Sequence, residues 1–137
     1  MSNLFSSTIY NVLEKSIDGA TLRHQVLSNN MANIDTPGFK RSDVEFKSVL
    51  RQTLNEQGIK GNLTHNKHIP IGRRNLDKLS ATVIRDNSTS MRPDGNNVDV
   101  ELESAEMAKN TLYHSAMTQQ LTAKYNTLKS VINEGRR

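Results

Sequence analysis

Cysteine and tryptophan are absent from this 137-residue chain, which contains only three Phe, three Tyr and three Pro. Without cysteine it can form no disulfide and offer no thiolate to a metal or a substrate. Hydrophobic residues make up 34% of the sequence, and no apolar run approaches the roughly 18 residues of a membrane span. The first ten residues lack the basic region and apolar core of a cleaved signal peptide. These absences favour a thin core whose apolar residues are concentrated in a few places.

Apolar residues near the N-terminus recur in steps of three and four, which is the spacing of one helix face. The pattern predicts a helix over residues 5–34, about 45 Å long. Its heptad seam consists of Leu13, Ile17, Ala20, His24, Leu27, Met31 and Ile34. Gly19 lies inside the pattern and weakens the helix by about 1 kcal/mol relative to Ala. We interpret His24 as a packed or hydrogen-bonded interface residue rather than as a ligand or a pH sensor.

A second helix is predicted at the C-terminus, because no Pro or Gly occurs between Asp99 and Gly135. Acidic residues near its start and basic residues near its end suit the helix dipole. Asn97 or Asp99 is the expected N-cap. Its apolar stripe consists of Leu102, Ala105, Ala108, Leu112, Ala116, Leu121, Ala123, Leu128 and Val131 or Ile132. Within this stripe, the predicted helix interface is formed by Leu112, Ala116, Leu121, Leu128 and Ile132.

The middle of the chain is basic, because residues 40–92 contain eleven Lys and Arg but only five Asp and Glu. Ser42 and Glu45 match a capping box, which predicts a short helix that starts at Ser42. Residues 58–97 show no helical period, although residues 81–84 could form a short strand. We interpret this segment as an arm that becomes ordered on a partner. For its charge, a solvated basic loop, an acidic protein or headgroup partner, and a nucleic acid are the alternatives.

A turn is predicted where the first helix meets the arm. Pro37 disfavours helical geometry at Thr36 and so stops the helix. Pro-Gly fits the centre of a type II turn, in which Gly38 has a positive φ. Phe39 then restarts the chain as an apolar anchor.

The expected fold is mainly α, with the long N- and C-terminal helices packed as an antiparallel, coiled-coil-like pair. A short helix and a largely irregular arm, with room for a small β element, lie between them. The predicted organisation is an N-terminal axial helix over 1–35, a turn, short helix and arm over 36–97, and a C-terminal axial helix over 98–137. Two such stripes cannot cover each other fully in a monomer of this size, and leftover apolar surface marks an interaction site.

No residue pattern defines a catalytic, cofactor or complete metal site. No Gly-x-Ser-x-Gly sequence positions a nucleophile, and the glycines are too dispersed for a phosphate-binding loop. His65 and His68 form at most half of a metal site, and we interpret them as surface histidines. The sequence therefore predicts a protein that is not an enzyme, has no small-molecule substrate and uses no cofactor or metal.

Segments near both ends resemble the bacterial flagellar rod and hook protein family. Residues 29–40 read NNMANIDTPGFK, similar to the N-terminal motif of that family. Residues 94–99 read DGNNVD and residues 117–121 read MTQQL, similar to the C-terminal half of its proximal rod branch. The length also resembles that of the short rod proteins nearest the membrane ring. The N-terminal motif is carried by Asn29, Asn30, Ala32, Asn33, Thr36, Pro37, Gly38 and Phe39.

This resemblance implies a structural subunit of the proximal rod of the flagellar basal body. It would polymerise through its terminal helices into the axial drive shaft that transmits torque. The implied partners are copies of the chain, other rod proteins, the membrane-ring protein with its adaptor, and the flagellar type III export apparatus. The implied location is the rod, within the periplasm or cell wall, after export without a cleaved signal peptide.

Two further interpretations depend on single features. Phe46 and Leu50 resemble the Phe-x-x-x-apolar segment that early export substrates of the family present to the export gate, and a short core-facing helix explains the two residues equally well. The basic arm gives the alternative function, a small helical nucleic-acid-binding protein whose affinity would fall steeply with salt.

Overall fold

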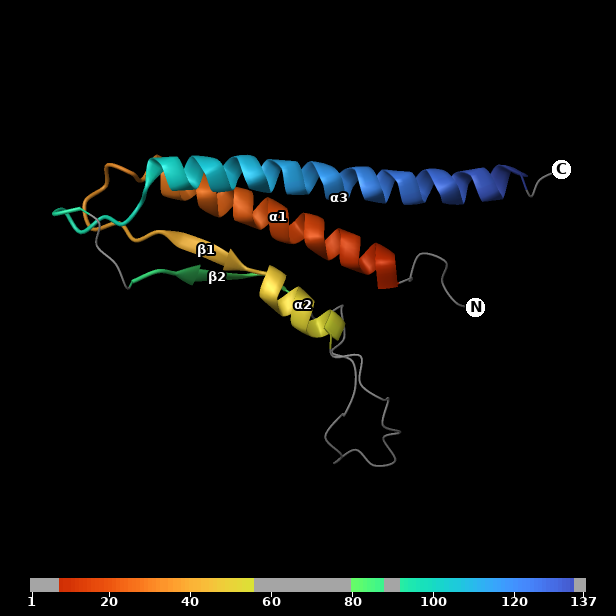
Figure 1. Cartoon of the computed structure of the whole chain (residues 1–137), viewed down its shortest axis with the longest axis horizontal. Coiled ribbons are helices and arrows are strands. Elements are labelled where there is room, and N and C mark those ends of the chain that lie inside the picture. Colours follow the sequence, from red (N-terminus) through yellow and green to blue (C-terminus); the bar gives the residue numbers. More distant parts are fainter. Residues whose placement is uncertain (1–7, 56–79, 88–91, 135–137) are drawn as a thin grey trace, which may run out of the picture.

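A computed structural model describes residues 8–55, 80–87 and 92–134 of the chain. Its elements are α1 (Thr8–Ala32), β1 (Ser42–Glu45), α2 (Lys47–Asn55), β2 (Thr82–Arg85) and α3 (Val100–Glu134). Figure 1 shows α1 between α3 and the ribbon formed by β1 and β2. The prediction of a mainly α fold, with two long helices, a short helix and a small β element, is therefore confirmed.

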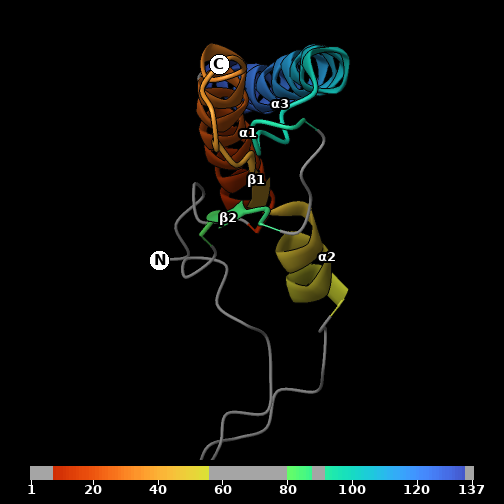
Figure 2. The same cartoon turned by 90° about the vertical axis from the view of Figure 1, so that its left-hand side faces the viewer.

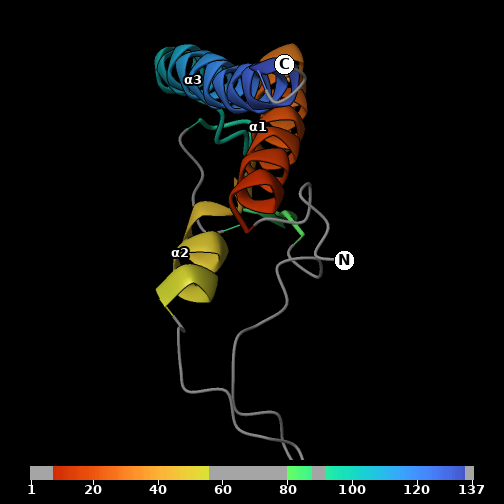
Figure 3. The same ribbon diagram turned by 90° about the vertical axis from the view of Figure 1, so that its right-hand side faces the viewer.

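Helices α1 and α3 pack antiparallel. Three contacts define their register: Asn30 with Glu103, Ala20 with Asn110, and Tyr10 with Tyr125. Seen end-on, the two helices lie next to each other, and the ribbon and α2 lie below them (Figures 2 and 3). Because α3 has 35 residues and α1 has 25, α3 extends beyond the first turn of α1 (Figure 1).

The start of α3 follows from its capping residue. Asp99 Oδ1 accepts hydrogen bonds from the backbone N–H groups of Glu101 at 2.9 Å and Leu102 at 3.4 Å. These groups would otherwise lack a partner in the first turn of the helix. Asp99 is thus the N-cap. Asn97, the other candidate, instead forms hydrogen bonds with the backbone of Arg41 and Asp86. The predicted extension of the first helix to residue 5 lies outside the described residues.

The ribbon corrects one local prediction. The register pairs Ser42 with Arg85, Asp43 with Ile84, Val44 with Val83 and Glu45 with Thr82. The strand suggested at 81–84 is present but shifted by one residue, at Thr82–Arg85. The predicted helix start at Ser42 is wrong, because α2 begins at Lys47. Glu45 instead accepts a hydrogen bond from Ser48 Oγ at 2.9 Å. A capping box is a local signal, whereas this strand forms on a partner far along the chain.

Phe46 is the centre of the small core that joins the arm to α1. Phe46 is 5% exposed and clusters with Val44. The partly buried hydrophobic residues packed against this pair are Leu22, Val26, Val49, Leu50 and Ala81. The ring lies so close to Gly19 that a Cβ there would be 2.7 Å from Phe46 Cγ. The glycine that weakens α1 is therefore what allows the arm to approach it.

Candidate assembly interface

The turn after α1 has the predicted geometry. The N–H of Phe39 donates to the carbonyl of Thr36 at 3.2 Å, and Gly38 has a φ of +71°. Pro37 and Gly38 are therefore the central residues of a turn that needs a left-handed conformation. The N–H of Gly38 also donates to the carbonyl of Asp94 at 2.9 Å, so this turn is tied to the segment that leads into α3.

Asn96 closes the same region from the other side of the chain. Its side chain is fully buried, and Nδ2 lies 2.9–3.0 Å from the carbonyl oxygens of Asn33, Ile34 and Thr36. Its Oδ1 accepts the N–H of Val98 at 2.7 Å. Carbonyl groups at the end of a helix have no partner within the helix. One amide from the C-terminal half of the chain supplies partners for three carbonyls that follow α1.

Asn30 joins three elements through one amide group. Its Oδ1 accepts the N–H of Ser42 at 3.0 Å, and its Nδ2 donates to the carbonyl of Ser42 at 2.7 Å. The same Nδ2 donates to Oε2 of Glu103 at 3.0 Å. Asn30 and Glu103 have no exposed surface. This side chain of α1 therefore pairs with the peptide of the arm and with the first turns of α3 together.

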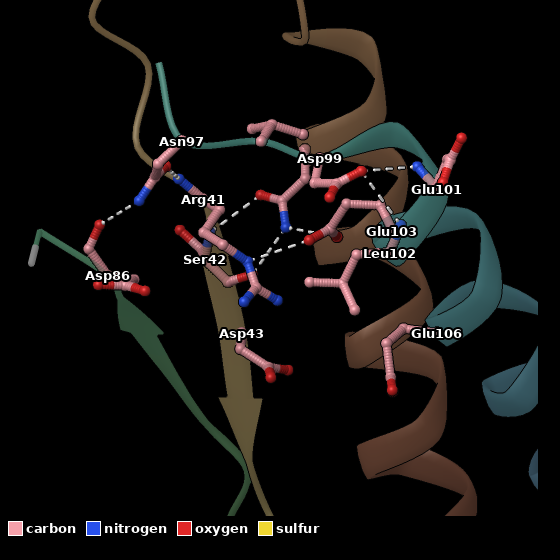
Figure 4. A network of polar contacts seen from close by, with 12 residues as sticks. Arg41, Ser42, Asp43, Asp86, Asn97, Asp99, Glu101, Leu102, Glu103 and Glu106 are labelled. Carbon is pink, nitrogen blue, oxygen red and sulfur yellow. Dashed lines mark hydrogen bonds and ion pairs between the residues drawn. The ribbon is translucent and has the colours of Figure 1, made fainter. Parts of the chain in front are cut away.

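Arg41 and Asn97 complete this arrangement, which we call the junction clasp (Asn30, Arg41, Ser42, Asn97 and Glu103). Arg41 Nε lies 3.0 Å from Oε1 of Glu103. Asn97 accepts the N–H of Arg41 at 2.7 Å and donates to the carbonyl of Asp86 at 3.0 Å. Figure 4 shows Asn97 between Arg41 and Asp86, and Arg41 directed toward Glu103. The clasp thus holds both strands of the ribbon to the axial helices.

A second charged group lies further along the helix pair. Arg23 of α1 contacts Asp43 of β1 at 3.1 Å and Glu106 of α3 at 3.3 Å. Lys109 donates a hydrogen bond to Glu106 at 2.9 Å. That bond is the main cause that lowers the pKa of Glu106; burial opposes it, and the positive charges of Lys109, Arg23 and Lys47 add to the lowering. Glu106 is therefore held ionised between the helices and the arm.

The motif residues predicted to serve assembly fall into two groups. Asn30 is buried and Asn33 and Phe39 are half-buried, so these three serve the fold of the junction. Asn33 Nδ2 donates to the carbonyl of Asn29 at 2.8 Å. The remaining motif residues are exposed in the isolated chain: Asn29, Ala32, Thr36, Pro37 and Gly38. An assembly role for the exposed group remains a prediction.

Most of the predicted helix-interface residues of α1 are buried or half-buried in the isolated chain. Ala20 and Leu27 are buried, at 3% and 0% exposed, whereas His24 is exposed. The half-buried members of the predicted seam are Leu13, Ile17, Met31 and, after the helix, Ile34.

The residues predicted for α3 divide between two faces. Leu121 and Leu128 are half-buried, in phase with Glu103 and Asn110 on the side that meets α1. Leu112 and Ala116 are exposed on the opposite side. Ile132 is in phase with Leu128 but is exposed, because α3 extends beyond α1 at that point. The sequence analysis missed only the junction end of the inner face, because the buried residues there, Glu103 and Asn110, are polar. Their spacing from Leu121 and Leu128, which places all four residues on one side of the helix, is the sequence feature that could have indicated their burial.

Two kinds of feature are absent from the described part of the chain. Across residues 8–55, 80–87 and 92–134, no three His, Asp or Glu side chains lie together as a metal site would need. No helix within these ranges has the length and hydropathy to cross a membrane. The predicted surface histidines at 65 and 68 lie outside the described residues.

Comparison with known proteins gives the family. A family profile described as "Flagella basal body rod protein" matches residues 22–40, which include the end of α1 and the turn. The flagellar basal body rod protein FlgB of Bacillus subtilis is 34% identical over 135 residues, covering 98% of this chain and 99% of the relative. FlgB of Borreliella burgdorferi is 37% identical over 107 residues, covering 74% and 78%. FlgB of Aquifex aeolicus is 34% identical over 122 residues, covering 89% and 90%.

The matched segment includes Asn30 of the junction clasp and the turn at Pro37 and Gly38. The profile ends at residue 40, immediately before Arg41 and Ser42 of the junction clasp, and the relatives extend the likeness over nearly the whole chain. The family is a structural one, so the alternative of a nucleic-acid-binding protein has no support. The chain therefore belongs to the flagellar basal body rod protein family, in its FlgB branch.

Proposed function

We propose that the chain, a structural subunit of the proximal flagellar rod, polymerises through an outer face of α3 into the axial shaft that transmits torque. Its neighbours would be further copies, other rod proteins and, at the base, the membrane-ring protein with its adaptor. It would reach this place, in the periplasm or cell wall, through the flagellar type III export apparatus without a cleaved signal peptide. The family supports rod assembly, and the surface of α3 supports the choice of face.

The outer face of α3 consists of apolar residues on the side opposite α1. Successive helix residues are 100° apart, which places its members within an arc of about 40°. These members are Ala105, Leu112, Ala116 and Ala123, and all four are exposed. Leu112 is 74% exposed, the highest value among the large hydrophobic side chains of the described residues. Small side chains on either side of one large one allow a second helix to approach closely.

The C-terminal part of α3 carries a second apolar surface, outside the arc of the outer face. Beyond Tyr125, which contacts Tyr10, α3 runs past the first turn of α1. Val131 and Ile132 are 63% and 62% exposed there. An apolar helix end of this kind suits contact with a neighbouring subunit, because burying it removes apolar surface from water.

The experiment is a charge placed on the outer face. Leu112 is 74% exposed, so the unfolding transition of Leu112→Glu should be close to that of the wild-type chain. With the other rod proteins it should not form rod-like tubes visible by electron microscopy, and cells that carry it should not swim. Thr122→Glu, on a neighbouring exposed part of α3, is the matched control. A Leu112→Glu rod of normal length would overturn the proposed face.

We also propose that Phe46 and Leu50 act in export while the chain is unfolded. In the folded subunit Phe46 is buried and Leu50 is half-buried, so the folded surface does not present this pattern. Phe46→Ala should lower secretion. Val44→Ala is the matched control because it reduces the same core without changing the pattern. Equal secretion of the two variants would show that the segment serves only the core.

A further inference from the structure

Glu103 is a carboxylate without exposed surface at the start of α3. Its cation is Arg41, and its hydrogen-bond donor is Nδ2 of Asn30. Arg41 Nε and Glu103 Oε1 lie 3.0 Å apart, but neither atom has a hydrogen bond of acceptable geometry. Arg41 therefore acts on Glu103 chiefly by compensating its charge. A buried carboxylate is strongly unfavourable when it is left without such compensation.

The neighbouring charges do not replace Arg41. Glu106, one turn further along α3, is itself acidic and already contacts Arg23 and Lys109. Arg23 is also paired with Asp43 of β1. Asp99, at the other side of Glu103, is acidic and caps the helix. The compensation of Glu103 thus comes from Arg41, the residue that immediately precedes β1.

Asn30 depends on the same piece of the arm. Its Oδ1 accepts a hydrogen bond from the N–H of Ser42, and its Nδ2 donates to the carbonyl of Ser42 and to Glu103. If residues 41 and 42 left this position, Glu103 would lose its cation, and the buried amide of Asn30 would lose an acceptor and a donor. Both losses fall on the surface where α1 meets α3.

We propose that Glu103 makes the pairing of the axial helices conditional on the folded arm. The first turns of α3 dock onto α1 only when Arg41 and Ser42 are in place, so arm and helix pair form as one unit at the junction. A subunit whose arm is unfolded opens its helix pair at this end. This coupling acts within one subunit and is independent of the face through which subunits polymerise.

Hydrogen exchange of the full-length chain tests this coupling. Arg41→Met leaves Glu103 without its cation and keeps much of the apolar stem. We expect amide exchange to become at least tenfold faster in β1 and, to a similar degree, in residues 103–107 of α3. Arg92→Met is the matched control, because Arg92 lies close to the junction but its side chain is 44% exposed; it should change exchange there less than threefold.

Removing the charge of Glu103 as well distinguishes this coupling from a general loss of stability. In the double variant Arg41→Met with Glu103→Gln, the buried carboxylate is gone, and exchange in α3 should return to within threefold of the wild-type rate. Arg41→Lys keeps a cation, so its exchange rates should lie between those of wild type and Arg41→Met. This variant still provides a measurement if the methionine variant unfolds. Faster exchange in β1 with an unchanged α3, or a double variant as fast as Arg41→Met, would overturn the proposal.

Discussion

The ring of Phe46 occupies the space that a side chain at Gly19 would need. A Cβ on Gly19 would lie 2.7 Å from Phe46 Cγ and 2.8 Å from Cδ1, distances that force one of the two residues to move. Gly19 is inside α1, where Ala has the higher helix propensity. Packing and propensity therefore act in opposite directions at this position, and their difference can be measured.

We expect Gly19→Ala to lower the free energy of unfolding by about 1–3 kcal/mol, because overpacking a buried contact outweighs the gain in helix propensity. Ser28→Ala, an exposed position of α1, is the control and should be neutral or slightly stabilising. Denaturant unfolding followed by circular dichroism measures both. A stabilised Gly19→Ala chain would mean that Phe46 does not pack on α1 in solution.

Asn96 should be among the most sensitive polar residues. Asn96→Ala leaves the three carbonyls after α1 without their shared donor and should cost about 1–3 kcal/mol of stability. Asn126→Ala, in the exposed part of α3, should be close to neutral. The two variants can be compared by thermal unfolding. Equal transitions would show that water replaces the amide of Asn96 without loss.

Gly38 tests the turn by conformation alone. No atom lies within 4 Å of the position that a Cβ would take there, so only the φ of +71° opposes a side chain. Gly38→Val should cost about 1–2 kcal/mol, whereas Gly38→Asn should be tolerated, since Asn visits this conformation more readily. We expect normal expression and export of Gly38→Val but failure to build a rod, and hence no swimming. Motile Gly38→Val cells would contradict this role of the turn.

Glu106 gives the chain a pH dependence. Its folded-state pKa is lowered, first by the hydrogen bond from Lys109. A lowered carboxyl pKa stabilises the folded state above the pKa of the unfolded chain, and this contribution is lost as the pH falls through the folded value. The stability difference between wild type and Glu106→Gln should therefore be present at pH 7 and shrink as the pH falls below about 4.

The control for this measurement is Asp18→Asn, which removes an exposed carboxylate from the polar side of α1. Its stability difference from wild type should vary little over the same pH range. If Glu106→Gln also differs from wild type by a constant amount down to pH 3, the ion pairs around Glu106 do not stabilise the folded chain.

Features that depend on neighbouring residues were readable without a structure. The three- and four-residue spacing predicted the long helices, and the absence of Pro and Gly predicted the length of α3. Asp99 was one of two expected N-caps, and the left-handed Gly38 followed from its place after Pro37. Such signals act over a few residues, so they are present in the sequence itself. The motif that includes this turn also indicated the family.

Features that depend on distant partners came from the folding of the whole chain. Ser42 is in a strand rather than at a helix start because Arg85 pairs with it and Asn30 binds its peptide group. Glu103 is buried because Arg41, 62 positions earlier, compensates its charge. The exposure of Leu112 depends on which side of α3 meets α1, and periodicity alone identifies a stripe but not its partner. Long-range charge compensation and burial place these side chains, and neither is encoded within a local window of sequence.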